Sequence, residues 1–186
     1  VGAIGIPGTD WETVIFDENK KPVKQGEVGE LAVKGPSVMK CYYRDEKATE
    51  ATLYGEWLMT GDMAMQDADG FIYLVDRKKD VIISGGENLY PVEIENFIRQ
   101  NDKVKDVAVI GTPDPRLGEK ATAIIELKEG MECSVDEMNE FCKGMPRYKR
   151  PKQIIFADIP RNPTGKIEKP KLRKMYSGDS VVAKQN

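Results

Sequence analysis

Over its first 75 residues the chain alternates short apolar stretches with clusters of turn-forming residues, a pattern typical of half-buried strands. Apolar stretches of this kind lie at residues 13–16, 29–33, 63–65 and 71–74. The last two flank Asp69-Gly70, which predicts a hairpin. Residues 44–53 predict a helical turn or two, and Gly61-Asp62 predicts a turn. This part of the chain is therefore predicted to be rich in β-strands.

The pattern changes after the charged run at 76–80, because strands then alternate with helices of about ten residues. Short strands are predicted at 81–83, 104–110, 121–127 and 153–156, and helices beginning at Pro91, Ser134 and Glu168. Ile94, Phe97 and Ile98 share one face of the first helix. The apolar face of the second helix is predicted to consist of Val135, Met138, Phe141 and Cys142. We therefore expect an α+β protein in two parts, a β-rich part and then a small domain in which helices cover strands.

Composition limits the chemistry that this chain can perform. Its 186 residues are 40% hydrophobic with a net charge of −3, and no apolar run approaches the ~20 residues that span a bilayer. The absence of histidine excludes Ser-His-Asp and Cys-His nucleophile pairs and histidine-ligated metal sites. Cys41, Cys133 and Cys142 show no C-x-x-C spacing, which argues against a zinc cluster or a disulfide framework and favours a reducing, cytoplasmic compartment. The first residue is Val1 and no signal peptide follows it, so we expect a cut from a longer chain.

Positive charge is concentrated near the C-terminal end of the sequence. Between Lys143 and Lys174 there are eleven Lys or Arg residues against two acidic ones, Asp158 and Glu168. Such a distribution is compatible with a polyanionic partner, either a phosphate-bearing small molecule or a nucleic acid, although the charge run by itself favours a solvated basic face. Few aromatic residues are interleaved with the charges, which gives base stacking little support.

Three segments occur in a fixed order and carry the most specific information. They are Thr60-Gly61-Asp62, residues 76–95, and residues 163–167 with the sequence Pro-Thr-Gly-Lys-Ile. Together they closely resemble the C-terminal part of the adenylate-forming superfamily, which includes acyl-CoA synthetases, adenylation domains that load carrier proteins, and luciferases. Residues 29–43 and 148–152 extend the resemblance over nearly the whole chain, except the tail after Tyr176.

The resemblance implies a reaction in two halves, neither of which needs a histidine. A carboxylate attacks the α-phosphate of ATP to give acyl-AMP and pyrophosphate, and a thiol then displaces AMP. The family's catalytic lysine corresponds to Lys166, whose ammonium offsets the two anions that adenylation brings together. Asp62 and Arg77 correspond to nucleotide-binding residues, Lys79 to the hinge between domains, and Ser84, Gly85 and Gly86 to the CoA channel. Arg147, Lys149 and Arg150 are candidates for contact with CoA phosphates.

The resemblance also implies a division of the chain. Residues 1–75 correspond to the C-terminal β-rich portion of the large AMP-binding domain, 76–80 to the hinge and 81–176 to a mobile C-terminal lid, and 177–186 form a tail expected to be disordered. The implied cosubstrates are ATP with Mg²⁺ and CoA, with the Mg²⁺ site mainly in upstream sequence and none expected in this chain. The implied partners are the chain's own N-terminal domain and a small carboxylic acid, with neither nucleic acid nor a transmembrane segment expected. Because the family's phosphate loop lies upstream, the chain alone is not expected to turn over.

Residues 82–91 favour one branch of the family, because they are more similar to CoA ligases than to carrier-loading adenylation domains. The leading hypothesis is an ATP-dependent acid:CoA ligase that acts on a fatty or aryl acid. The alternatives are an adenylation domain that loads a carrier protein, and a non-catalytic binding or regulatory module that keeps the lid fold.

Overall fold

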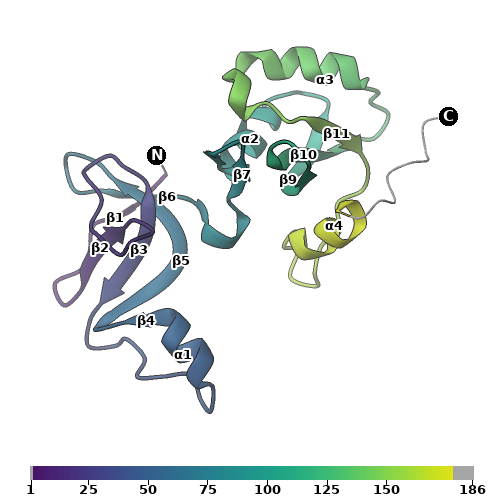
Figure 1. The fold of residues 1–186 in the computed structure, drawn as a ribbon. Coiled ribbons are helices and arrows are strands. Elements are labelled where there is room, and N and C mark those ends of the chain that lie inside the picture. Colours follow the sequence, from purple (N-terminus) through teal and green to yellow (C-terminus); the bar gives the residue numbers. More distant parts are fainter. Residues whose placement is uncertain (1, 178–186) are drawn as a thin grey trace. The chain divides into compact units, whose positions relative to one another are not determined.

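The computed structural model of the chain describes residues 2–177, and it divides into two compact units, one ending at Lys79 and the other beginning at Asp80 (Figure 1). Both units are built around β-sheet, and helices are more prominent in the second. The predicted α+β class is therefore confirmed. Residues 178–186 of the tail that we expected to be disordered lie outside the described residues.

The N-terminal unit is a six-stranded sheet in the order β1-β6-β5-β3-β2, with β4 paired to β5, and all of these strand pairs are antiparallel. Its elements are β1 (Ala3–Gly5), β2 (Glu12–Phe16), β3 (Gly29–Lys34), α1 (Glu46–Thr52), β4 (Leu53–Tyr54), β5 (Trp57–Gln66) and β6 (Ile72–Arg77). Side chains from successive strand positions form two buried clusters, one around Ile15 and Leu31 and the other around Phe16 and Ala32. This arrangement follows from the two-residue period of the strands.

The turn predicted at Gly61-Asp62 is wrong, because β5 continues through both residues. Its partner strand shows the reason: Met59 lies opposite Ala32 and Met63 opposite Glu30, so β5 accommodates extra residues as a bulge. Gly61 adopts a φ of +74°, which glycine tolerates without a Cβ clash. The hairpin predicted around Asp69-Gly70 is confirmed, and β1 was not predicted.

The C-terminal unit is a five-stranded sheet centred on β10, which pairs with β9 on one edge and with β11 and β7 on the other. Its elements are η1 (Lys78–Asp80) at the boundary, β7 (Ile82–Ser84), β8 (Glu87–Leu89), α2 (Pro91–Ile98), β9 (Val104–Asp114), β10 (Gly118–Leu127), α3 (Val135–Phe141), η2 (Cys142–Gly144), η3 (Arg147–Lys149), β11 (Gln153–Phe156) and α4 (Lys169–Tyr176). The strands predicted at 104–110, 121–127 and 153–156 are confirmed, the first two being longer than expected.

Helices cover both faces of this second sheet (Figure 1). Val107 and Val109 of β9 pack in the cluster that contains Ile94 and Ile98 of α2, together with Met138 of α3. The intervening Ala108 and Ile110 pack on the opposite face in the cluster that contains Leu172 of α4. Burial on both faces explains why β9 is apolar at successive positions rather than alternating.

Two helix starts have the local structure that the sequence predicts. Pro91 occupies the first turn of α2, and the Ser134 hydroxyl accepts a hydrogen bond of 3.1 Å from the Glu137 N–H at the start of α3. Val135 is 39% exposed, so its assignment to the apolar face of α3 is wrong. None of the helices within residues 2–177 is both long enough and apolar enough to span a membrane.

Candidate active-site elements

Asp62 and Arg77 lie directly opposite each other where β5 pairs with β6. The Arg77 Nε is 3.4 Å from an Asp62 carboxylate oxygen, and both side chains are open to solvent, at 63% and 30% exposure. The hydroxyl of Thr60 donates to the Leu31 carbonyl and accepts from the Asp62 N–H, which fixes the backbone beside the Gly61 bulge. The sheet register therefore brings these two predicted nucleotide-binding residues together as a solvent-accessible ion pair.

An open hollow of about 490 Å³ adjoins this pair. It is lined by Thr60, Gly61, Arg77, Lys78 and Lys79. Gly61 adds no side chain to the wall, and a Cβ built there would meet nothing within 4 Å, so the space beside it is open. The cationic side chains at this hollow and the nearby carboxylate suit a ligand that carries both phosphate and hydroxyl groups.

The boundary between the units falls inside a single 3-10 turn, η1. On one side, the Lys78 ammonium donates to the nearly buried Glu30 carboxylate at 2.8 Å within the N-terminal unit. On the other side, Asp80 is buried and accepts a 2.7 Å hydrogen bond from Arg173 of α4 within the C-terminal unit. Lys79 lies between these two anchors, and its exposed side chain has no ion pair with the described residues.

Ser84, Gly85 and Gly86 form the tight hairpin that joins β7 to β8. Gly85 and Gly86 have φ values of +60° and +87°, so both central positions of the turn require a residue that tolerates a left-handed conformation. The Gly85 N–H donates to the Leu117 carbonyl at 2.9 Å, which ties the turn to the start of β10. The two glycines therefore have a structural reason to be there, in addition to the channel role that the family resemblance implies.

Lys166 stands on a loop whose shape is fixed by one asparagine side chain. The Asn162 carboxamide oxygen accepts hydrogen bonds from the N–H groups of Thr164 and Lys166 and from the Thr164 hydroxyl, at 3.1, 2.9 and 2.7 Å. The Asn162 N–H donates to the Lys166 carbonyl, and Gly165 adopts a φ of +83° at the tip. This geometry leaves the Lys166 side chain exposed, with no counter-ion among the described residues.

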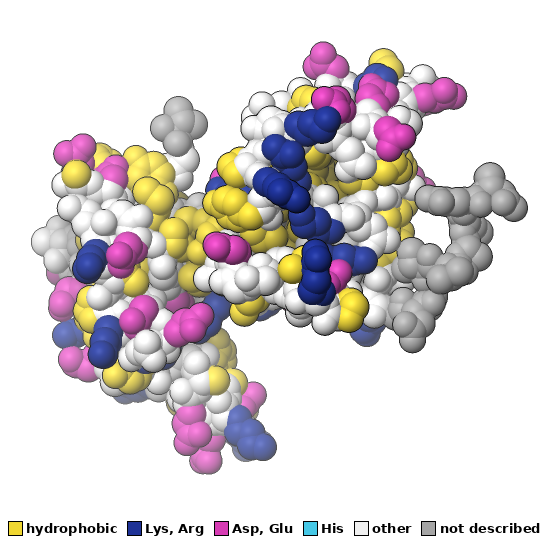
Figure 2. Space-filling model, turned by 45° about the horizontal axis from the view of Figure 1, so that its top comes forward, with side chains coloured by type: hydrophobic (Ala, Val, Ile, Leu, Met, Phe, Trp, Pro, Cys, Tyr) yellow, Lys and Arg dark blue, Asp and Glu magenta, His cyan; other side chains and the backbone are white. Residues whose placement is uncertain are grey.

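The three candidate CoA contacts differ in their surroundings. Lys149 donates to Glu93 at 2.5 Å, and this hydrogen bond raises the pKa of Lys149. The Arg150 guanidinium donates to the carbonyls of Met145 and Lys143, both at 2.9 Å. Arg147 is exposed and has no hydrogen bond or ion pair through its side chain to the described residues. Figure 2 shows a row of Lys and Arg side chains across one face of the C-terminal unit, and Arg147 is the candidate most available to a phosphate.

No cluster of three or more Cys, Asp or Glu residues within residues 2–177 has the geometry of a metal site. The cysteines at 41, 133 and 142 are all free, and burial raises the pKa of the Cys142 thiol to about 11. A buried thiol with so high a pKa is a poor nucleophile at neutral pH. The Cys142 thiol is therefore not a candidate nucleophile.

Two family models match the chain in the order that its motifs suggest. Residues 1–43 match the AMP-binding enzyme family, and residues 93–166 match the AMP-binding enzyme C-terminal domain. The chain belongs to the AMP-binding enzyme family. The second match ends at Lys166, so it includes the loop of the predicted catalytic lysine.

Individual AMP-binding enzymes are similar to nearly the whole chain. The indoleacetate–CoA ligase of Aromatoleum aromaticum is 40% identical over 178 residues, which are 95% of this chain and 35% of the ligase. A long-chain-fatty-acid–CoA ligase of Salmonella typhimurium is 40% identical over 179 residues, or 95% of this chain and 32% of the ligase. The solved structure of o-succinylbenzoate CoA synthetase from Bacillus subtilis, in complex with its acyl-adenylate intermediate, superposes with a TM-score of 0.85 at 35% identity, covering 96% of this chain and 37% of that one. The chain thus spans about a third of the length of the curated relatives it matches.

Sequence reasoning missed a set of paired charged side chains that lies under the Lys166 loop. Glu95, Asp106 and Arg161 belong to this set, although none of them was a candidate site residue. Glu95 follows the apolar Ile94 on α2 and is only 4% exposed. Apart from Arg99, which follows four residues later on α2, its partners Val109 and Lys169 are not neighbours in the sequence, so no local pattern could have identified them.

Proposed function

We propose that this chain acts as the C-terminal part of an ATP-dependent acid:CoA ligase, which activates a carboxylic acid as acyl-AMP and transfers the acyl group to CoA. The observation that carries the proposal is the exposed Lys166, which has no ion pair among residues 2–177, on a hydrogen-bonded loop within the segment that matches the family's C-terminal domain. The Asp62–Arg77 pair supports it from the N-terminal unit.

In the adenylation half-reaction, a carboxylate oxygen of the substrate acid forms a bond to the α-phosphorus of ATP. The bond from that phosphorus to the pyrophosphate oxygen breaks, and pyrophosphate leaves. Two anions must approach each other, so an ammonium placed between them lowers the barrier. Lys166 supplies this charge, and the Asp62 carboxylate accepts hydrogen bonds from the ribose hydroxyls while Arg77 contacts the same nucleotide.

In the thioester half-reaction, the thiolate sulfur of CoA attacks the acyl carbon, the bond from that carbon to the phosphate oxygen breaks, and AMP leaves with the electron pair of that bond. Residues 81–176 act as a mobile lid in this scheme, and Lys79 is the hinge, because it is the unanchored residue between the Lys78 and Asp80 contacts. The turn at Ser84, Gly85 and Gly86 offers a surface without bulky side chains for the pantetheine chain. Arg147 contacts a CoA phosphate, with Lys149 and Arg150 nearby as supporting cations.

Magnesium accompanies ATP in this proposal, and residues 2–177 contain no group of three or more Cys, Asp or Glu side chains that could hold a metal ion. We therefore assign no step to the metal within this chain, and the rest of the ligase would hold it.

The substrate is a fatty or aryl acid, as the names of the indoleacetate and long-chain relatives suggest. Three free cysteines support a reducing, cytoplasmic compartment.

The proposal is tested with the full-length ligase that contains this chain. A panel of fatty and aryl acids is screened for acid-dependent exchange of pyrophosphate into ATP, and then for CoA thioesters by mass spectrometry. We expect exchange without CoA, and a thioester only when CoA is added. Exchange followed by transfer to a carrier protein but not to CoA would favour a carrier-loading enzyme, and no exchange with any acid would favour a binding module.

A further inference from the structure

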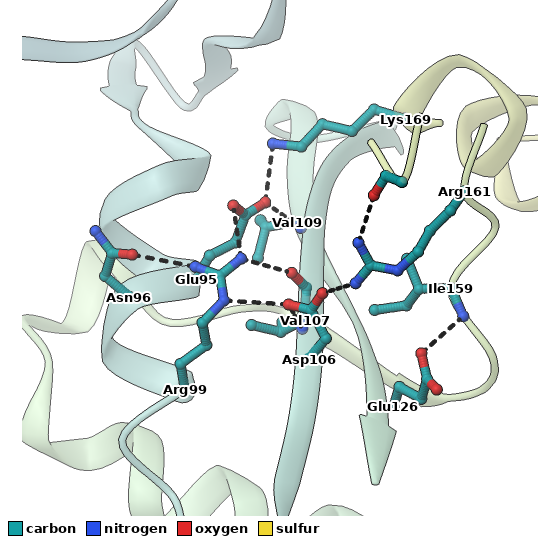
Figure 3. A network of polar contacts seen from close by, with 11 residues as sticks. Glu95, Asn96, Arg99, Asp106, Val107, Val109, Glu126, Ile159, Arg161 and Lys169 are labelled. Carbon is teal, nitrogen blue, oxygen red and sulfur yellow. Dashed lines mark hydrogen bonds and ion pairs between the residues drawn. The ribbon is translucent and has the colours of Figure 1, made fainter. Parts of the chain in front are cut away.

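A continuous polar network connects the Lys166 loop to strand β9 and helix α2 (Figure 3). Its charged members are Glu95, Arg99, Asp106, Arg161 and Lys169. They come from α2, from the nearby start of β9 and from the 161–169 segment, where Arg161 lies 55 residues after Asp106. The network therefore fixes where the loop lies on the C-terminal unit.

Arg161 is the link between the loop and the strand. One guanidinium nitrogen donates to the Gly165 carbonyl at 2.8 Å, and another pairs with the Asp106 carboxylate on β9. Gly165 immediately precedes Lys166, so this hydrogen bond acts on the peptide unit that carries the lysine. A planar guanidinium holds two acceptors in fixed directions, which a single ammonium cannot do.

Asp106 is itself held in place from the other side. Its second carboxylate oxygen accepts from the Arg99 Nε at 3.1 Å and from the Val107 N–H at 2.8 Å. Burial works to raise the pKa of Asp106, but the Val107 N–H and two guanidinium groups outweigh it and keep that pKa below its ordinary value. Asp106 is therefore ionised at neutral pH, and its side chain is only 16% exposed.

A second contact holds the end of the loop where α4 begins. The Lys169 ammonium is 2.8 Å from the Glu95 carboxylate, and the two side chains are 14% and 6% exposed. The same Glu95 oxygen accepts from the Val109 N–H of β9 at 2.8 Å. Both ends of the loop are thus attached to β9, one through Asp106 and the other through Glu95.

Within the loop, the glycine at the tip needs such support. Gly165 has a φ of +83° and no atom within 4 Å of the place where a Cβ would stand, so packing does not restrict it. The Asn162 hydrogen bonds fix the loop's internal shape, but they do not fix its position on the sheet. The contact from Arg161 to Asp106 supplies that second constraint.

We propose that Arg161 and Asp106 are positioning residues for Lys166, which together hold the adenylation lysine at a fixed place on the C-terminal unit. The inference rests on the proposed function, because it assigns these residues to the half-reaction that uses Lys166. A displacement of about 1 Å in a catalytic group can lower a rate by about a hundredfold. Loss of the Arg161 bridge should therefore slow adenylation, while thioester formation from ready-made acyl-AMP does not use Lys166 and should proceed.

The test compares Arg161→Gln, Asp106→Asn and the double variant in the full-length ligase. Each preparation is assayed twice, once for pyrophosphate exchange and once for thioester formation from chemically synthesised acyl-AMP and CoA. The ratio of the two rates does not depend on how much of the sample is folded. We expect that ratio to fall about 10- to 100-fold in each single variant. The double variant should be no worse than the poorer single one, because both changes break the same bridge.

Lys103→Ala is the matched control, since it removes an ion pair to Glu137 in the same unit without contacting the loop. Its ratio should equal that of the unmodified enzyme. Lys166→Ala in the same assays separates the two hypotheses. If Lys166→Ala lowers the ratio and the Arg161 and Asp106 variants do not, the positioning role is wrong while the proposed function stands. If Lys166→Ala leaves adenylation intact, the assignment of the catalytic lysine itself fails.

Discussion

Arg147, Lys149 and Arg150 lie close together in the sequence, but their side chains differ in the contacts that they make. Lys149 is engaged by Glu93 and Arg150 by two backbone carbonyls, so binding a phosphate would require each to exchange an existing contact. The Arg147 side chain has no such contact with the described residues. Of these three, Arg147 is therefore the residue that we expect to bind a CoA phosphate.

We predict that Arg147→Ala raises the KM for CoA about tenfold, which corresponds to the loss of about 1.4 kcal/mol of charge-assisted binding. The measurement is thioester formation against CoA concentration in the full-length ligase. Lys149→Ala is the matched comparison, and it should raise the KM less because that ammonium is already paired. A larger effect from Lys149→Ala than from Arg147→Ala would contradict this ranking.

The family resemblance assigned roles to residues within motifs, but it did not identify the residues outside those motifs that hold them in position. Lys166, Asp62 and Arg77 were candidates from the sequence, and their chemical roles remain predictions. Arg161 and Asp106 are 55 residues apart and meet only because the loop lies against β9. Contacts of this kind depend on the tertiary fold, and no local spacing encodes them.

Among the elements, periodic segments were the easiest to predict. The α2 start at Pro91, the α3 cap at Ser134 and strands β9, β10 and β11 follow from local patterns. The three-residue strands β1 and β8 were not predicted, because neither contains the pair of β-branched residues that marks the equally short β7. Gly61 predicted a turn because glycine favours turns and bulges alike, and only the pairing with β3 decides between them.

Substitutions at the hairpin between β7 and β8 can separate the contribution of its glycines to stability from their proposed role in the CoA channel. Gly86→Asn is expected to retain most of the stability, because Asn tolerates a positive φ, while Gly86→Val should destabilise the unit by about 1–2 kcal/mol. Chemical denaturation measures both. If pantetheine passes this turn, each variant should slow thioester formation in its folded fraction and leave adenylation unchanged. Normal thioester formation by Gly86→Asn would contradict the channel role.

At the scale of the whole molecule, the boundary between the units has one anchored residue on each side. Lys78 is held by Glu30 of the first unit, and Asp80 by Arg173 of the second. Any rotation of one unit against the other that preserves both contacts must be absorbed at or beside Lys79. This is the physical reason to keep Lys79 as the proposed hinge, which residue type alone could not have indicated.

We predict that Lys79→Pro leaves adenylation measurable and blocks thioester formation, because proline restricts the backbone rotation that the second half-reaction needs. Both half-reactions are measured on one preparation of the full-length ligase, so adenylation serves as the internal control for folding. Equal loss of the two activities would argue against a hinge at this position.

The central claim is that Lys166 provides the charge for adenylation, and Lys166→Ala tests it most directly. The measurement is acid-dependent pyrophosphate exchange by the full-length ligase, with Lys174→Ala, an exposed lysine of α4, as the control. The account predicts that Lys166→Ala lowers exchange by about a hundredfold or more and that Lys174→Ala leaves it unchanged. Undiminished exchange in Lys166→Ala would contradict the account.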